Sequence, residues 1–198
     1  MPEVIVIGSG TGVPSLNKAS PAILLKTKNN FVLLDSFVAG VKSPNWEITH
    51  LYVRELNILP CIACGECDKK GECPIKDDMQ AIYPLLSQTD AMIVATPVYF
   101  YNVPTQLKAL IDRCQLFWYK RKRPISFRPG YLIAVGGREE KSIFEGIFLT
   151  IKSFFLTLGA RLKASWTYAG IDNLDTIRKH PTALKEVYQA GKKLCQKS

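Results

Sequence analysis

Residues 91–102 read AMIVATPVYFYN, and the prediction of the fold starts here. The first five residues of this stretch are all apolar, the pattern of a central strand buried on both faces of a parallel sheet. The apolar run ends at Thr96-Pro97, and three aromatic residues follow within the next four positions. Ligands of open α/β sheets bind beyond the carboxyl ends of the strands. The stretch therefore predicts a core strand that leads into a ligand-binding loop.

Four more stretches that fit strands alternate with helical patterns along the 198 residues of the chain. Strands that alternate with helices imply an α/β fold, a doubly wound parallel sheet of five strands with helices on both faces. We expect one domain, residues 1–198, which is long enough to bury a substantial core. The expected strands are residues 3–7, 48–53, 91–95, 131–135 and 162–168. The expected helices are residues 34–41, 77–86, 104–119, 143–158 and 182–194.

The first expected strand runs into residues 8–12, which read GSGTG. A turn rich in glycine and hydroxyl residues at a strand end can hold a phosphate with its backbone N–H groups. It is not a dinucleotide fingerprint, because the third glycine comes one place too early for G-x-G-x-x-G. After this turn, residues 22–28 fit a helix, but residues 22–25 and 31–34 fit two strands of a hairpin equally well.

The cysteine pattern carries the strongest chemical signal, because residues 61–74 read CIACGECDKKGECP. Three cysteines recur at every third residue, which should curl the backbone and turn their sulfurs toward one point. The fourth follows a short excursion that Gly71 allows to turn. Four thiolates around one centre are the ligand set of a cubane iron–sulfur cluster. This pattern predicts a cluster held by Cys61, Cys64, Cys67 and Cys73.

Two other readings of the cysteines are weaker. A structural zinc site usually pairs two C-x2-C units across a longer gap, and three cysteines this close together would strain a zinc tetrahedron. A disulfide framework is disfavoured further, because the chain shows no secretory signal and C-x2-C spacing suits metal or redox chemistry.

Other candidate residues have both a functional and a structural interpretation. The aromatic loop at residues 96–102 can hold a planar ring such as isoalloxazine, or it can be an aromatic cluster at the edge of the core. Gly136-Gly137 allows close approach of a ligand to the backbone, or it forms a simple turn. Lys108, Asp112 and Arg113 are interpreted as ion pairs on a helix surface, and no catalytic residue is assigned.

The composition limits the class of protein. The formal net charge of +9 suits an anionic cofactor, an acidic redox partner or nucleic acid. We expect no nucleic acid, because the basic residues are spread along the chain and no recognition motif occurs. No apolar run is long enough to span a membrane, so we expect a cytoplasmic protein without membrane contact.

Residues from about 33 to 198 resemble the iron–sulfur flavoproteins of the NADPH-dependent FMN reductase superfamily. The resemblance implies a flavodoxin-like sheet, FMN over the strand ends, and a [4Fe-4S] cluster on the four cysteines of a cluster-binding loop at residues 57–76. It also implies a homodimer or homotetramer that passes electrons between cluster and flavin. The matching motifs are LNILPC at 56–61, the four-cysteine run, KDDM at 76–79, DA at 90–91, TPVYF at 96–100 and LKALIDR at 107–113.

The resemblance also assigns roles to individual residues and partners. Ferredoxin or NAD(P)H would donate electrons, and a quinone or another small oxidant would accept them. The alternatives are an NAD(P)H-dependent FMN or quinone reductase without a functional cluster, or a zinc-stapled nucleic-acid-binding module. The expected FMN-binding residues at the ring are Pro97, Val98, Tyr99, Phe100, Asn102, Gly136 and Gly137. Ser9, Thr11 and Ser15 are expected at the phosphate from the chemistry of their turn, which lies before the residues that carry the resemblance.

Residues from about 1 to 36 depart from the flavoprotein pattern. They are similar to the N-terminal segment of metallo-β-lactamase-fold hydrolases, but the chain has only two histidines and lacks the H-x-H-x-D-H motif of those enzymes. We therefore expect an atypical N-terminal segment whose first strand still joins the sheet, because Val4 to Ile7 is fully apolar.

Overall fold

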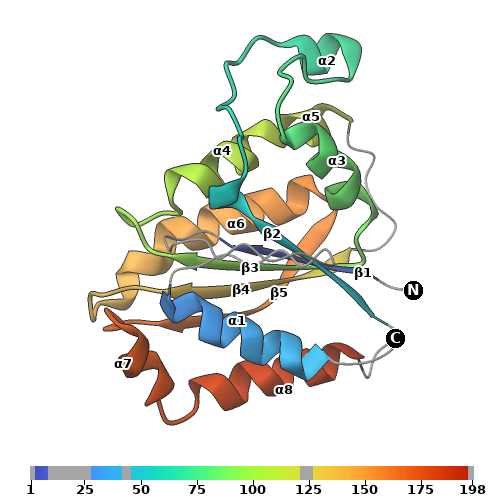
Figure 1. Cartoon of the computed structure of the whole chain (residues 1–198). Coiled ribbons are helices and arrows are strands. Elements are labelled where there is room, and N and C mark those ends of the chain that lie inside the picture. The colour runs from blue at the N-terminus through green and yellow to red at the C-terminus, as the bar shows by residue number, and fades with distance from the viewer. Residues whose placement is uncertain (1–2, 9–27, 42–45, 121–126, 196–198) are drawn as a thin grey trace.

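The computed structural model of the chain describes residues 3–8, 28–41, 46–120 and 127–195. A sheet of five strands lies between two layers of helices (Figure 1). Its strand order is β2-β1-β3-β4-β5, and every neighbouring pair is parallel. This is the doubly wound order of flavodoxin-like proteins. The strands are β1 (Glu3–Gly8), β2 (Glu47–Tyr52), β3 (Ala91–Pro97), β4 (Arg128–Val135) and β5 (Ala160–Tyr168).

All five expected strands are present, and the first of them joins the sheet as expected. The apolar run at the start of β3 is buried on both faces. Met92 and Val94 belong to the core on one side of the sheet, and Ala91 and Ile93 belong to the core on the other. A strand in this position cannot alternate apolar and polar residues, because both of its faces are covered by helices.

The helices are divided between the two faces of the sheet. Helices α3, α4 and α6 lie on one side, and α1 and α8 lie on the other (Figure 1). None of the helices within the described ranges is long and apolar enough to cross a bilayer. The α-helices are α1 (Lys28–Val41), α2 (Glu66–Lys70), α3 (Met79–Gln88), α4 (Thr105–Arg113), α5 (Gln115–Lys120), α6 (Glu145–Thr157), α7 (Leu174–Arg178) and α8 (Ala183–Cys195), and the short 3-10 helices are η1 (Val53–Glu55) and η2 (Lys141–Phe144).

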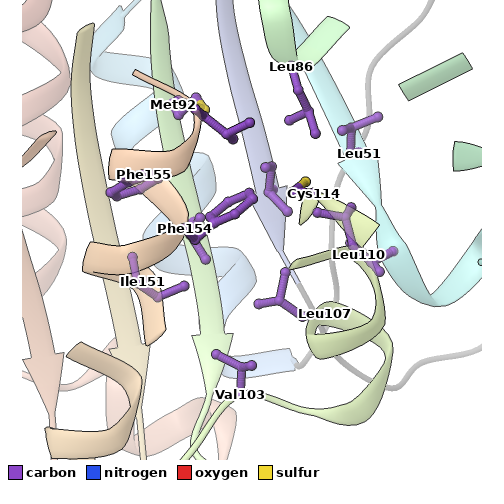
Figure 2. Close-up of a cluster of buried hydrophobic side chains, with 14 of the residues drawn as sticks. Leu51, Leu86, Met92, Val103, Leu107, Leu110, Cys114, Ile151, Phe154 and Phe155 are labelled. Carbon is purple, nitrogen blue, oxygen red and sulfur yellow. The ribbon is translucent and has the colours of Figure 1, made fainter. Parts of the chain in front are cut away.

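The larger core lies between the sheet and α3, α4 and α6. Figure 2 shows Leu107 and Leu110 of α4 on one side of this core, and Phe154 of α6 and Met92 of β3 on the other. Cys114, just after α4, points into the same cluster and is 1% exposed. A free cysteine in such a position behaves as a small apolar residue.

Helices α1 and α8 approach each other closely at two glycines. A Cβ atom built at Gly40 would collide with the backbone carbonyl of Tyr188, and one built at Gly191 would collide with the carbonyl of Phe37. Cys195 donates from its Sγ to the carbonyl of Val41 at 3.0 Å, near the end of the same contact. The glycines thus allow the two backbones to touch where side chains would hold them apart.

The hairpin interpretation of residues 31–34 is wrong, because these residues lie in α1. Leu33, Leu34, Phe37 and Val41 form a stripe at helical spacing that is buried against the sheet and α8, which favours the helix. The alternative helix at residues 22–28 lies outside the described residues except for its last position. The helix expected at 104–119 is two helices, α4 and α5, that meet at Cys114.

Arg128 ties the ends of two helices together at the start of β4. Its guanidinium donates to the carbonyls of Leu86, Ser87 and Thr89 at the end of α3, at 3.2, 3.2 and 2.6 Å. It also donates to the carbonyl of Leu158 just after α6. The last carbonyls of a helix cannot be satisfied within it, so a cation at this position stabilises the C-terminal ends of both α3 and α6.

Candidate functional site

The cysteine loop leaves the sheet at the carboxyl end of β2, where η1 follows the strand directly. Figure 1 shows α2 and the segments around it standing away from the sheet, beyond α5. Gly65 and Gly71 flank α2 in left-handed conformations, with φ of 74° and 70°. Ala63 is also left-handed, with φ of 53°. These reversals let a short chain begin and end one helical turn within a few residues.

All four cysteines of the loop line one pocket of about 390 Å³. Cys61 and Cys64 are exposed, Cys67 and Cys73 are partly buried, and all four are free thiols. Ala63 and Gly65 are left-handed, so the backbone between the first three cysteines departs from the regular curl that their spacing predicts. Among the described residues, no three histidine, cysteine or acidic side chains lie close enough together to hold one metal ion.

A buried ion pair closes the neck of the cysteine loop. Arg113 donates to Asp77 at 2.5 Å, and the two side chains are 1% and 0% exposed. Arg113 also donates to the carbonyls of Leu59, at 2.9 Å, and Ile75, at 3.3 Å. Asp77 in turn accepts a hydrogen bond from the backbone N–H of Leu59 at 2.9 Å. One ion pair thus holds the beginning and the end of the loop together.

Neighbouring residues reinforce this neck. Asp78 accepts a hydrogen bond from the backbone N–H of Asn57 at 2.7 Å, and Gln80 donates to the carbonyls of Cys73 and Ile75 at 3.2 and 2.6 Å. Asp77 and Asp78 precede α3 and bind the loop, so the helix expected at residues 77–86 begins two residues later, at Met79. The four-cysteine loop is consequently anchored on α3 and α4.

The ion pair keeps both of its members charged. Burial alone would lower the pKa of Arg113, but the hydrogen bond to Asp77 and the interactions with Tyr83 and Cys73 together outweigh it, so the pKa is raised. Burial alone would raise the pKa of Asp77, but the hydrogen bonds from Arg113 and Leu59 bring it below its usual value. In the same region, burial is the main cause that raises the pKa of Cys67, and the nearby Cys61 and Cys73 add to it.

The interpretation of Arg113 as a surface residue is wrong. Lys108 and Asp112 do form the expected pair one helical turn apart, at 2.7 Å and about half exposed. Arg113 instead points into the protein and pairs with Asp77, which is 36 positions away in the sequence. One signal could have found this pair, because Asp77 and Arg113 belong to two separate motifs of the family resemblance, KDDM and LKALIDR.

The aromatic loop after β3 forms a tight two-residue turn. Tyr99 and Asn102 exchange two backbone hydrogen bonds, of 2.8 and 2.9 Å. Between them, Phe100 and Tyr101 are both left-handed, with φ of 49° and 62°. Bulky residues rarely adopt this conformation, so the turn is strained. Phe100 is fully exposed at its tip, and Tyr99 and Tyr101 are about half exposed.

Residues of helix α6 contact this turn. Thr150 donates from its hydroxyl to Oδ1 of Asn102 at 3.0 Å, and the same oxygen accepts from the backbone N–H of Val103 at 2.8 Å. Gly146 lies so close that a Cβ there would collide with the carbonyl of Tyr101. The contacts of Gly146 and Thr150, one helical turn apart, hold the strained turn in place.

Gly136 and Gly137 follow β4, beside the aromatic loop. A Cβ at Gly136 would collide with Ile143 and lie 3.1 Å from Val98, and one at Gly137 would collide with the side chain of Asp172. Ile143 and Asp172 make these contacts with the ends of flexible side chains, so close packing within the protein favours both glycines but does not by itself require them.

The expected ring-binding residues after β3 and β4 are thus brought together at one edge of the sheet. Pro97 ends β3 beside Val135, and the backbone N–H of Val98 donates to the carbonyl of Val135 at 2.9 Å. Gly8, the last residue of β1, pairs with Ala95 of β3, so the end of β1 lies at this edge as well. The expected phosphate-binding residues Ser9, Thr11 and Ser15 lie outside the described residues.

The sequence and fold of this chain resemble those of known flavoproteins. A family model described as NADPH-dependent FMN reductase matches residues 19–144, which is more than half of the chain. The chain belongs to the NADPH-dependent FMN reductase family. The family consists of FMN reductases, so the chain is an FMN-dependent oxidoreductase.

Known proteins similar to this chain are consistent with this assignment. An iron–sulfur flavoprotein of Methanosarcina thermophila is 29% identical over 86% of this chain and 88% of its own length. An iron–sulfur flavoprotein of Methanocaldococcus jannaschii is 38% identical, and the match spans 59% of each chain. Among solved structures, an NAD(P)H:quinone oxidoreductase from Methanothermobacter marburgensis has a TM-score of 0.65 at 19% identity, over 97% of this chain and 96% of that one. This likeness confirms the flavodoxin-like fold.

Proposed function

We propose that this FMN-dependent oxidoreductase is an iron–sulfur flavoprotein that transfers electrons between a [4Fe-4S] cluster and FMN. Cys61, Cys64, Cys67 and Cys73 would hold the cluster. The observation that carries the proposal is that these four free thiols line one pocket, in a loop that leaves the same edge of the sheet as the aromatic loop. The names of the two iron–sulfur flavoproteins similar to this chain give it further support.

The residues of the pocket fit such a cluster. A volume of about 390 Å³ is more than ten times the roughly 30 Å³ that one water occupies, which leaves room for four irons and four sulfides. Four thiolates are the ligands that such a cluster needs, whereas a single zinc ion needs its ligands within about 2.3 Å. Arg113 also lines the pocket, and its buried Nε has no hydrogen-bond partner among the described residues.

The aromatic turn is proposed as the place where the flavin ring binds. Tyr99 and Phe100 offer exposed aromatic surface at the strand ends, next to Pro97, Val98 and Asn102. Flat aromatic surfaces pack against planar rings with a gain beyond the buried area alone. Backbone groups of Gly136 and Gly137 would complete the site, with Ser9, Thr11 and Ser15 at the phosphate.

The chain's own residues would then position and insulate the two groups. When bound, the cluster supplies transfer of single electrons and FMN supplies transfer of two electrons. NAD(P)H or a ferredoxin would supply the electrons, and a quinone that takes up two electrons and two protons, or another small oxidant, would consume them. A homodimer or homotetramer is proposed as the working form, as the family resemblance implies.

The test is the composition of protein purified without oxygen. We expect brown protein with a flavin spectrum, four irons and four sulfides per chain, and both absorbances bleached by dithionite. Colourless protein that contains zinc would overturn the proposal. Cys64→Ser should remove most of the iron and slow electron delivery to one-electron acceptors. The matched control is Cys195→Ser, because Cys195 lies in α8 outside the pocket. If Cys64→Ser behaves like wild type, the chain is an FMN or quinone reductase without a functional cluster.

A second variant tests the flavin site separately. Tyr99→Ala should raise the dissociation constant of FMN and leave the iron content unchanged, because Tyr99 lies in the turn after β3 and not in the cysteine pocket. Tyr188→Ala, which removes a partly exposed tyrosine of α8, serves as the control. Equal loss of iron and flavin in Tyr99→Ala would indicate general unfolding and argue against a local role.

A further inference from the structure

Two charged side chains, Asp112 and Arg113, line the pocket of the four cysteines. Asp112 is about half exposed and paired with Lys108 at 2.7 Å, so water and salt screen its charge. Arg113 is 1% exposed, and its partner Asp77 is fully buried but is not part of the pocket lining. The positive member of a buried pair therefore faces the pocket, with the negative member farther from it.

The hydrogen bonds of Arg113 leave one donor unused. Its Nη1 and Nη2 atoms donate to Asp77 and to the carbonyls of Leu59 and Ile75. Its Nε is buried and has no hydrogen-bond partner within the part of the chain that the structure describes. An unpaired buried N–H is costly, and each one in a folded protein needs an explanation. An acceptor in the pocket, such as a thiolate or sulfide, would remove that cost.

We propose that the pair of Arg113 and Asp77 sets the reduction potential of the [4Fe-4S] cluster, an inference that rests on the function proposed above. Reduction takes one electron from the donor and adds one negative charge to the contents of the pocket. A buried guanidinium beside the pocket stabilises the more negative state, because charges interact strongly where little water screens them. Charge and hydrogen bonds to the sulfurs are known determinants of cluster potentials. Arg113 therefore raises the potential, and Asp77 partly offsets this.

The two members of the pair allow a test in which a structural role and an electrostatic role give different results. Arg113→Gln and Asp77→Asn both weaken the clamp at the neck of the loop, so purely structural damage should affect both in the same way. Their charges are opposite, so an electrostatic role predicts shifts of opposite sign. Arg113→Lys keeps the charge but loses Nε, and Lys108→Gln removes an exposed charge from the same helix as a control.

The experiment is a dithionite titration of anaerobic protein, followed by electron paramagnetic resonance, with iron measured on each sample. We expect Arg113→Gln to lower the reduced-to-oxidised ratio at a fixed potential about tenfold, which is a shift of about 59 mV to more negative values. Asp77→Asn should shift the potential to more positive values. Arg113→Lys should give a smaller negative shift than Arg113→Gln, and Lys108→Gln should match wild type.

Several results would overturn the inference. Shifts of the same sign in Arg113→Gln and Asp77→Asn, or wild-type potentials in both with iron still bound, would show that the pair only builds the neck. Loss of iron from both of these variants and from Arg113→Lys would lead to the same conclusion. Wild-type protein without a cluster is a separate outcome, because it refutes the proposed function itself and the inference falls with it.

Discussion

Replacing Gly146 with alanine should weaken FMN binding without destabilising the fold. Gly146 lies in the first turn of α6, and its close contact is with the carbonyl of Tyr101 in the strained aromatic turn. An added methyl group must push that carbonyl away. Overpacking of this kind costs about 1–3 kcal/mol. Alanine is also the better helix former, by up to about 1 kcal/mol, so helix α6 itself should not suffer.

The size of the effect on FMN follows from where the cost arises. In the free protein the exposed turn can shift and avoid the methyl group. If FMN binds the turn as it stands in the structure, the bound state must bear the cost of overpacking. A cost of 1–3 kcal/mol corresponds to a rise in the FMN dissociation constant of roughly 5- to 150-fold.

The assay is a titration of flavin-free protein with FMN, followed by flavin fluorescence, beside urea unfolding of the same sample. Ser153→Ala is the matched control, because Ser153 is exposed on α6 and gains the same kind of helix propensity. We expect the control to bind FMN like wild type. A Gly146→Ala protein with wild-type stability and an FMN dissociation constant within about twofold of wild type would refute the role of the turn.

Three further predictions concern the stability of the scaffold. Burial lowers the pKa of His50 from 6.5 to about 4, so the unfolded chain takes up a proton at a higher pH than the folded one. The contribution of His50 to stability is therefore complete above pH 6.5 and is lost as the pH falls from 6.5 to 4. By pH 5 this loss is about 2 kcal/mol, and urea unfolding at pH 7.5 and 5.0 should show a smaller difference in His50→Gln than in wild type. Arg128→Met should lower the free energy of unfolding by about 3 kcal/mol, because it removes the hydrogen bonds to two helix ends. Arg161→Met, at an exposed position of β5, is the control and should cost less than about 1 kcal/mol. Gly191→Ala should lower the free energy of unfolding by about 1–2 kcal/mol although alanine favours helices, because its methyl group meets the backbone of α1. Gln189→Ala, exposed on the same helix, should have no such cost, and equal stability of the two variants in urea unfolding would contradict the close contact.

The central strand β3 could be predicted from the sequence because burial on both faces leaves a continuous apolar run that is easy to recognise. The N-terminal part was harder, since residues 31–34 are apolar in a way that suits a strand or a helix. The helix is favoured because these residues form a buried stripe with Phe37 and Val41 that packs against α8. Helix α8 lies at the far end of the chain, so a local sequence pattern does not reveal this contact. Tertiary contact thus overrode an ambiguous local pattern.

The sequence predicted which residues make up the site, but not the ion pair and the backbone turn that hold them in place. The cysteine spacing predicted that the four cysteines lie together, and all four line one pocket. The pair of Arg113 and Asp77 could not be read from a helical pattern, because such patterns show only partners three or four positions apart, and here the nearby Lys108 and Asp112 offered a local alternative. The two-residue turn at Phe100 and Tyr101 was also hidden, because such turns usually contain glycine or asparagine.

The clamp at Leu59 and Ile75 also determines what a change in loop length would cost. The chain between these residues is a closed loop whose ends meet at one ion pair. The entropy of closing such a loop grows only with the logarithm of its length, by about 0.6 kcal/mol for each doubling. An insertion between Cys67 and Cys73 would therefore barely affect the stability of the sheet. The stability of the sheet therefore places little constraint on the spacing of the cysteines, and that constraint would come instead from the cluster proposed for the pocket.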